Sequence, residues 1–105
     1  MDKAAIKEVI DFLKQSLIKH GIQVESIAMF GSALSNTMDK DSDIDLIIVS
    51  QDFRNLDLFE RARMTMKPEI ETLRKFKIPM DIINFSPEEY NDSNVKKFYQ
   101  SKIVA

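Results

Sequence analysis

The spacing of apolar residues predicts two long amphipathic helices. Residues 3–19 form the first, because apolar side chains recur there every three or four positions between charged ones. Gly21 is expected to end this helix, with His20, the only histidine of the chain, capping its last turn. Residues 57–76 form the second, and Pro68 inside it predicts a kink or a division into two helices. The apolar face of this second segment consists of Phe59, Ala62, Met66, Ile70, Leu73 and Phe76.

Three shorter apolar runs predict β-strands at residues 24–30, 44–49 and 78–85. They have the length and the β-branched residues of strands, and they end near turn-forming residues. The run at 44–49 is apolar on both faces, which indicates a central position in a sheet. The segment from Ser86 to Glu89 has the serine, proline and glutamate of a capping box, so a short helix is expected to begin there.

The remaining segments are short. A brief helix is expected after Gly31 at residues 32–35, and residues 91–94 have the composition of a break before a last helix. Residues 103–104 are either a final strand or a frayed end. The predicted order is α-β-α-β-α-β-α, which favours an α/β (α+β) fold with a small mixed β-sheet flanked by helices. The length of 105 residues predicts a single domain spanning 1–105.

Composition limits the classes of function. The chain has no cysteine, which excludes disulfides and thiolate metal sites. It has no apolar run of membrane-spanning length and no signal-peptide pattern, so we expect a cytoplasmic protein that does not bind a membrane. The net charge of −2 argues against general nucleic-acid binding. Residues 1–53 have 5 basic and 9 acidic side chains, whereas residues 54–77 have 7 basic and 4 acidic ones. This division suits a metal–triphosphate ligand, and it also fits solvated helix faces or a protein interface.

Two aspartates open the second apolar run. Asp43 and Asp45 are two positions apart, so on a strand their side chains would point to the same face and converge. Two ionised carboxylates repel one another unless a cation compensates them, and Mg²⁺ prefers carboxylate oxygens, water and phosphates. A solvated acidic loop is the alternative. An EF-hand is excluded, because Ile44 and Ser50 stand where a loop from Asp39 needs glycine and glutamate.

Two further features accompany this carboxylate pair. Gly31 and Ser32 follow a predicted strand, where glycine permits close backbone approach, and N–H groups with a serine hydroxyl can bind phosphate. Asp81 lies inside the third apolar run, where a charge is costly unless it is paired or binds a metal. It is the candidate third carboxylate, and an edge-strand aspartate facing water is the alternative. The residues therefore indicate a nucleotide and a divalent metal.

The pattern resembles the DNA polymerase beta-like nucleotidyltransferase superfamily, and is closest to its minimal nucleotidyltransferase (MNT) branch. The family's Gly-Ser, short gap, Asp-x-Asp and later third Asp map onto Gly31, Ser32, Asp43, Asp45 and Asp81. The resemblance implies that the three aspartates are catalytic and bind two Mg²⁺ ions, and that Gly31 and Ser32 bind the nucleotide triphosphate, with ATP as the substrate. A hydroxyl then attacks the α-phosphorus and pyrophosphate leaves.

One part of the pattern departs from the family. Many relatives carry an arginine shortly after Gly-Ser, whereas this chain has the segment Ala33 to Ser35 there. Triphosphate binding would then depend on basic residues elsewhere. The candidates are Lys40, Arg61, Arg63 and Lys67.

The resemblance also implies a partner. Small stand-alone members of the MNT branch often act as antitoxins beside HEPN-domain RNase toxins, and some transfer AMP from ATP to a toxin tyrosine. The length of this chain resembles that class, which implies a HEPN-domain toxin protein as acceptor, in a hetero-oligomer. Two alternatives stay open: an antitoxin that blocks its partner sterically, and a nucleotidyltransferase acting on a small molecule or an RNA end. Phe98 and Tyr99 would mark a partner surface if exposed, and otherwise face the core.

Overall fold

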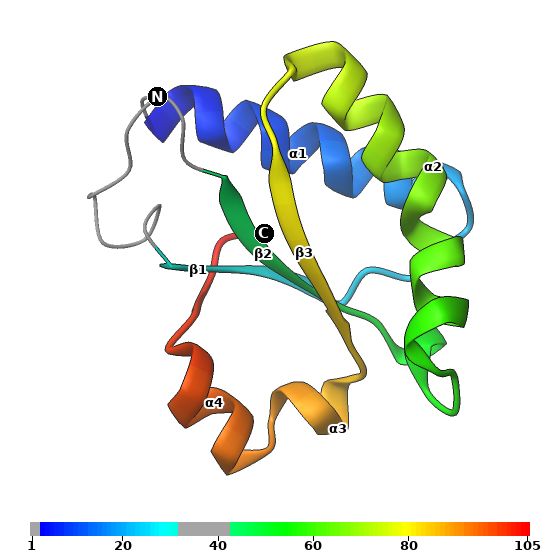
Figure 1. The fold of residues 1–105 in the computed structure, drawn as a ribbon, viewed down its shortest axis with the longest axis vertical. Helices are drawn as coiled ribbons and strands as arrows, with labels where there is room; N and C mark the ends of the chain where they lie inside the picture. The colour runs from blue at the N-terminus through cyan, green and yellow to red at the C-terminus, as the bar shows by residue number, and fades with distance from the viewer. Residues whose placement is uncertain (1–2, 32–42) are drawn as a thin grey trace.

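A computed structural model describes residues 3–31 and 43–105, in which helices pack on both faces of a four-stranded sheet (Figure 1). The strands are β1 (Ser26–Phe30), β2 (Ile44–Val49), β3 (Met80–Phe85) and β4 (Lys102–Ile103). The helices are α1 (Lys3–Lys19), α2 (Leu58–Phe76), α3 (Pro87–Tyr90) and α4 (Ser93–Tyr99), with a short 3₁₀ helix, η2, at Gln51–Phe53. The predicted α+β class is thus confirmed, whereas the short helix expected at residues 32–35 lies outside the described residues.

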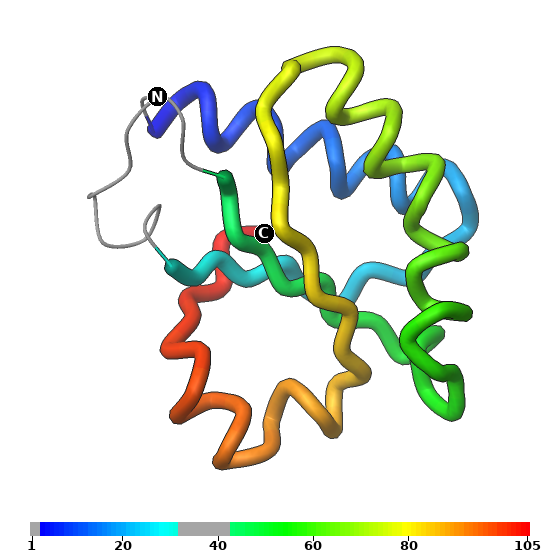
Figure 2. Tube along the Cα trace, in the orientation of Figure 1, coloured from blue at the N-terminus to red at the C-terminus, as the bar shows by residue number. Residues whose placement is uncertain are grey.

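The sheet is mixed, with strand order β3-β2-β1-β4. β2 pairs in parallel with β3 and antiparallel with β1, so it is central, as its apolar sequence predicted. The chain end returns to the sheet, where β4 pairs with β1 (Figure 2). β1 and β3 each begin two residues later than predicted. For β3 the reason is Pro79, which has no N–H to donate, and its carbonyl accepts a hydrogen bond from the Ile44 N–H.

Alternate residues of the strands divide the core into two clusters. Leu46 and Ile48 of β2 pack with the apolar face of α1, whereas Ile47 and Val49 point the other way and pack with Tyr90 of α3. This alternation is the two-residue period of a strand. The sheet therefore has one face toward α1 and α2 and one face toward α3 and α4.

The first helix forms as predicted. α1 buries its apolar stripe, and Gly21 ends it with φ of +86°, a conformation that glycine adopts at little cost. His20 caps the last turn, because its Nδ1 donates to the Ser16 carbonyl at 2.8 Å. The helix start at Ser86 is also confirmed, because Ser86 and Glu89 form a complete capping box. A separate last helix follows as expected, but it begins at Ser93, inside the predicted break at residues 91–94, because Asp92 caps it.

The second long helix departs from its prediction in two ways. α2 is a single continuous helix that contains Pro68, not two helices, and Asp57 with Glu60 forms the capping box at its start. Its buried side consists of Arg61, Thr65, Pro68 and Thr72, so most of the apolar face deduced from the sequence is exposed. Polar side chains can occupy the buried side because hydrogen bonds satisfy them. Among the described residues, no helix is both long and apolar enough to cross a membrane.

Candidate active site

Strand pairing brings two of the predicted aspartates side by side. Asp45 of β2 lies directly opposite Asp81 in the parallel ladder with β3, and opposite Phe30 in the antiparallel ladder with β1. Neighbouring strands are about 4.8 Å apart, so two ionised carboxylates in register repel each other. Asp45 and Asp81 are 36 positions apart in the sequence, so the local pattern of residues does not specify this register.

Asp43 belongs to the same group of charges although it precedes the strand, which begins at Ile44. Burial raises the pKa of Asp45 above its ordinary value, and the negative charges of Asp81 and Asp43 raise it further. Asp43 and Asp81 themselves are exposed, whereas Asp45 is half-buried. Asp45 is thus the central carboxylate of the three, and its ionised form lacks compensation from the described residues.

Gly31 forms the backbone side of the site. It has φ of +72°, a left-handed conformation that other residues adopt at a cost. A Cβ atom placed on it would lie only 2.1 Å from the Asp45 Oδ2 atom. The glycine of the sequence pattern therefore leaves the space that the Asp45 carboxylate fills, which ties the two halves of the Gly-Ser and Asp-x-Asp pattern together.

An aromatic cluster borders the carboxylates on the same face of the sheet. The ring of Phe30, opposite Asp45 in register, packs edge-to-face on Tyr99 with centroids 5.1 Å apart. Tyr99 also contacts Phe85 and Phe98. Tyr99 is half-buried and Phe98 is 79% exposed, so of the pair singled out from the sequence only Phe98 lies at the surface. The pairing of Tyr99 with the site was not predictable, because it depends on how α4 folds back over the sheet.

The carboxylate oxygens of the three aspartates suit a divalent cation that takes its remaining ligands from phosphates and water. Among residues 3–31 and 43–105, no three acidic or histidine side chains are gathered closely enough to hold a metal by themselves. The repulsion at Asp45 and the hard oxygen donors nevertheless fit Mg²⁺, which commonly binds one or two protein carboxylates and takes its other ligands from phosphates and water. Gly31, which has no side chain, leaves room for one of these donors, the Asp45 carboxylate.

The structure gives Arg61 a structural position that does not support its predicted contact with a triphosphate. The residue is 8% exposed, and its side chain donates to the carbonyl oxygens of Leu56 and Asn84 and to the Glu89 carboxylate, at 2.7–3.0 Å. Asn84 pairs with Ile48, three residues along the strands from the aspartate pair, a separation of about 10 Å. Arg61 therefore joins α2, β3 and α3 at the opposite end of the strands.

The other predicted basic residues also lie away from the aspartates or outside the description. Arg63 is exposed on α2, which packs on the sheet face opposite to that of Asp45. Lys67 follows one turn later on the same exposed side. Lys40 and Ser32 lie outside the described residues. The predicted basic residues of α2 therefore do not lie on the sheet face that carries Asp45.

Comparison with protein families gives one match that spans nearly the whole chain. The model of the nucleotidyltransferase domain family matches residues 6–105, which include all three aspartates and Gly31. A search of curated proteins finds no match.

Comparison with solved structures identifies similar folds at low sequence identity. A crystal structure from Sulfolobus solfataricus, classed as a nucleotidyltransferase, is 20% identical with a TM-score of 0.64, over 98% of this chain and 87% of that one. BolA1 from Arabidopsis thaliana is 18% identical with a TM-score of 0.56, over 77% of this chain and 94% of that one. Because proteins of different families share this fold, the fold alone does not decide the activity.

Proposed function

Because this chain belongs to the nucleotidyltransferase domain family, we propose that it transfers AMP from ATP to a hydroxyl group of a partner protein. The observation that carries the proposal is the grouping of Asp45 with Asp81 and Asp43 beside Gly31. The charges of Asp81 and Asp43 make the ionised form of Asp45 costly. None of the three carboxylates is paired with a cation among the described residues, so the grouping has no evident structural use on this face. A metal–nucleotide ligand removes that cost.

The three aspartates would hold two Mg²⁺ ions, which supply positive charge for the phosphate oxygens and for the attacking hydroxyl. Gly31 lets the backbone approach the phosphates closely because it has no side chain. Asp45 keeps its orientation because β2 is paired on both sides. Asp81 accepts the proton of the acceptor hydroxyl, whose oxygen bonds to the α-phosphorus while the bond to pyrophosphate breaks and pyrophosphate leaves with the electron pair.

The acceptor is proposed to be a protein because the described part of the site is open. Asp43 and Asp81 are exposed at the rim of a sheet, and the described residues include no second lobe that could enclose a small acceptor. An exposed site of this kind admits a tyrosine or serine carried on another folded surface. In view of the resemblance to the MNT branch, we propose a HEPN-domain toxin as that partner and an antitoxin role for this chain.

The test combines the purified chain with MgATP and with a HEPN-domain protein encoded beside it, and measures the intact mass of the partner. The expected result is a mass gain of one or more AMP units. Asp45→Asn should abolish the gain, while the matched surface variant Asp11→Asn, on α1, should retain it. An unchanged partner mass with the wild-type chain, in the presence of demonstrated MgATP binding, would refute transfer to this partner.

A second candidate function is neutralisation by binding alone. It is favoured by the uncovered apolar side of α2, where Phe59 is 78% exposed and Met66 50%. This candidate predicts that Asp45→Asn still neutralises the partner and forms a stable complex with it. Growth rescue by that variant therefore separates the two functions.

A further inference from the structure

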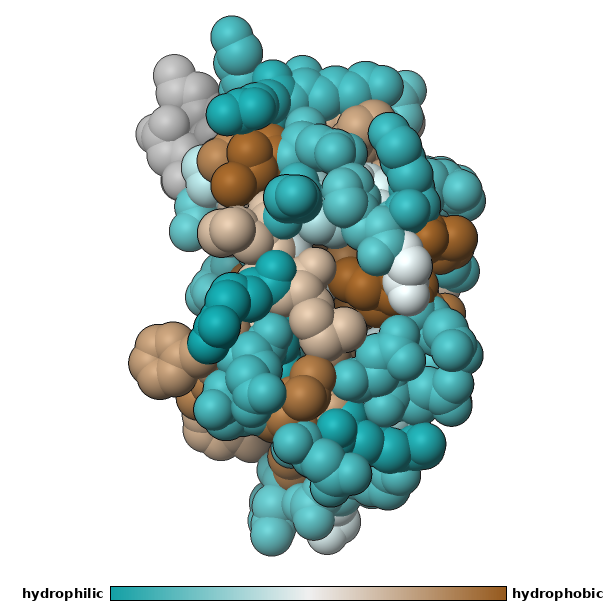
Figure 3. Space-filling view, turned by 90° about the vertical axis from the view of Figure 1, so that its right-hand side faces the viewer, coloured by the Kyte–Doolittle hydropathy of each residue, from teal (hydrophilic) through white to brown (hydrophobic). Residues whose placement is uncertain are grey.

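The outer side of α2 carries an apolar stripe that the rest of the described chain leaves uncovered. Phe59 is 78% exposed, Met66 50%, Ile70 39% and Leu73 45%. Their positions differ by seven, four and three residues, which places them along one side of the helix. Apolar side chains, brown and tan in Figure 3, run between hydrophilic ones on the side of the molecule where α2 lies. A contiguous apolar stripe of this kind is typical of an interaction surface.

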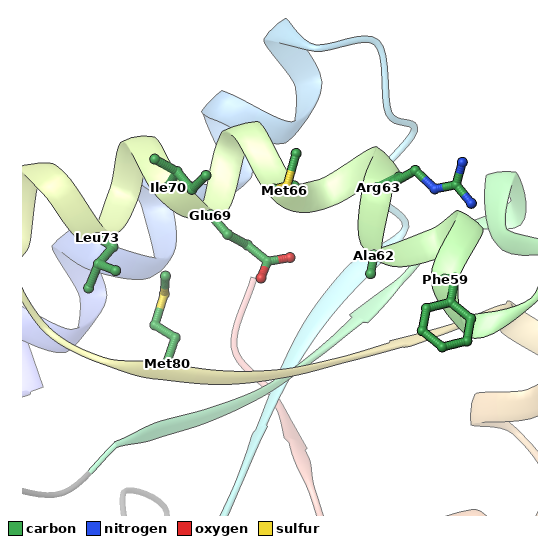
Figure 4. A pocket seen from close by; sticks show the side chains of 8 residues that line it. All are labelled: Phe59, Ala62, Arg63, Met66, Glu69, Ile70, Leu73 and Met80. Carbon is green, nitrogen blue, oxygen red and sulfur yellow. The ribbon is translucent and has the colours of Figure 1, made fainter.

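The stripe borders a groove between α2 and the edge strand β3. The groove has a volume of about 540 Å³ and is lined by seven side chains of α2 and by Met80 of β3 (Figure 4). The Glu69 carboxylate points from α2 into this space (Figure 4). β3 is the last strand of the sheet on that side, so within the described residues no further strand covers the groove.

A row of cations runs along one flank of the stripe, and its first member, Arg63, also lines the groove. Arg63, Lys67 and Arg74 are exposed and follow one another at helical spacing. Within the part of the chain that the structure describes, none of the three forms an ion pair. The acidic side chains beyond the row have other partners, since Glu60 closes the capping box of α2 and Glu71 accepts a hydrogen bond from α1. The row is therefore available to an external anion.

From this stripe and row we infer that the outer side of α2 binds an amphipathic helix of another protein, with acidic side chains along one flank. The stripe supplies the apolar contact and its helical period matches a helix laid alongside it. The exposed stripe from Phe59 to Leu73 is about 21 Å long, enough for four turns of a partner helix. The cation row favours a partner helix with acidic side chains on the flank that faces it, because opposite charges across an interface favour the right partner and register.

A second copy of this chain fits the same side less well. In an antiparallel pair of α2 helices related by a two-fold axis, each flank meets the same flank of the other copy, so the cations of Arg63, Lys67 and Arg74 would face themselves. Such like-charge contacts oppose association. The stripe lies on the sheet face opposite to that of Asp45, so the inference does not depend on the catalytic proposal.

The test uses two synthetic peptides of about 20 residues, each with a helical leucine stripe. One peptide carries glutamates along one flank of the stripe, and the other carries lysines at the same positions. Binding of the labelled peptides to the full chain is followed by fluorescence anisotropy at low and at physiological salt. We expect the glutamate peptide to bind about tenfold more tightly than the lysine peptide, with the difference shrinking as salt rises.

Variants of the chain locate the binding side. Met66→Ser with Ile70→Ser should weaken the glutamate peptide about tenfold, since exposed positions can change without unfolding the helix. Arg63→Glu with Lys67→Glu should reverse the preference and favour the lysine peptide. Lys97→Glu, which changes an exposed lysine of α4, is the matched control and should leave both affinities unchanged.

Three results would overturn the inference. The first is equal affinity for the two peptides, and the second is binding that the α2 variants do not alter although circular dichroism shows them folded. The third is a chain that sediments at twice its mass of 12.1 kDa at micromolar concentration and becomes monomeric in the Met66→Ser, Ile70→Ser variant. That last result would identify a second copy as the occupant.

Discussion

Replacing Asp45 by asparagine should stabilise the fold while removing the proposed activity. Asp45 is half-buried, lies opposite Asp81 in the parallel ladder, and has its pKa raised by burial and by the charges of Asp81 and Asp43. An acid whose pKa is raised by folding costs stability when it is ionised. Asparagine has nearly the same shape and carries no charge, so Asp45→Asn removes the cost and keeps the packing.

The expected gain is about 1 kcal/mol. Like charges directly opposite each other in a sheet destabilise it by roughly 0.2–1 kcal/mol, and partial burial of the carboxylate adds to this. Solvent reaches Asp45, Asp43 and Asp81. Screening therefore keeps the stability gain near the lower end of what a buried pair of charges would give. For a domain of this size, 1 kcal/mol corresponds to a rise in Tm of roughly 4–6 °C.

The assay is thermal unfolding of the wild type and of Asp45→Asn between about pH 8 and pH 4. The cost in the wild type is fully present above the folded-state pKa of Asp45 and disappears as the carboxylate is protonated at lower pH. The Tm advantage of the variant should therefore be largest at pH 7–8 and shrink toward pH 4. MgATP should raise the Tm of the wild type and leave that of the variant unchanged, since only the folded wild type binds it.

Asp11→Asn removes the same charge from an exposed position of α1 and serves as the control. It should give no stability gain and no change in the response to MgATP. If Asp45→Asn proves less stable than the wild type at pH 7.5, or if its advantage does not depend on pH, the carboxylates do not repel one another as argued.

Three further predictions follow from single contacts. Gly31→Ala should cost about 1–2 kcal/mol of folding stability, because residue 31 has a φ of +72°. It should also abolish stabilisation by MgATP, because the new Cβ displaces the Asp45 carboxylate. The backbone cost should persist in an Asp45→Ala background, and its absence there would contradict the assigned strain. Arg61→Gln should cost roughly 2–4 kcal/mol in urea unfolding, since it leaves buried groups without partners. Arg54→Gln, which breaks an exposed ion pair, is the control and should cost about 0–1 kcal/mol. Equal losses would show that the Arg61 contacts are not structural. Burial acts to raise the pKa of Glu89, but hydrogen bonds from Arg61 and the backbone outweigh it and lower the pKa below 4.5; stability should therefore be lost as the pH falls below that value, and Arg61→Gln should flatten the acid limb of the stability curve.

The sequence determined the local structure of this protein well. α1 has the predicted bounds, β2 spans the predicted residues, and the capping box at Ser86 starts a helix. These features depend on residues within a few positions of each other, so the periodicity of apolar side chains and the chemistry of caps and turns are enough to specify them. The Gly-Ser and Asp-x-Asp pattern likewise predicts Gly31, Asp43 and Asp45 as candidate site residues without reference to the fold.

The tertiary structure decided which groups meet. The register that sets Asp81 beside Asp45 and the fit of Gly31 against the Asp45 carboxylate join segments that are distant in sequence. The sequence also did not determine which side of α2 is buried. Periodicity defines an apolar stripe, but it does not specify whether that stripe faces the core or the solvent. Arg61 could face inward only because Glu89, 28 residues later, and the β3 backbone accept its hydrogen bonds. Long-range packing brings these hydrogen-bond partners to Arg61. Because the polar side of α2 is thereby buried, its apolar stripe is left exposed on the outer side of the helix.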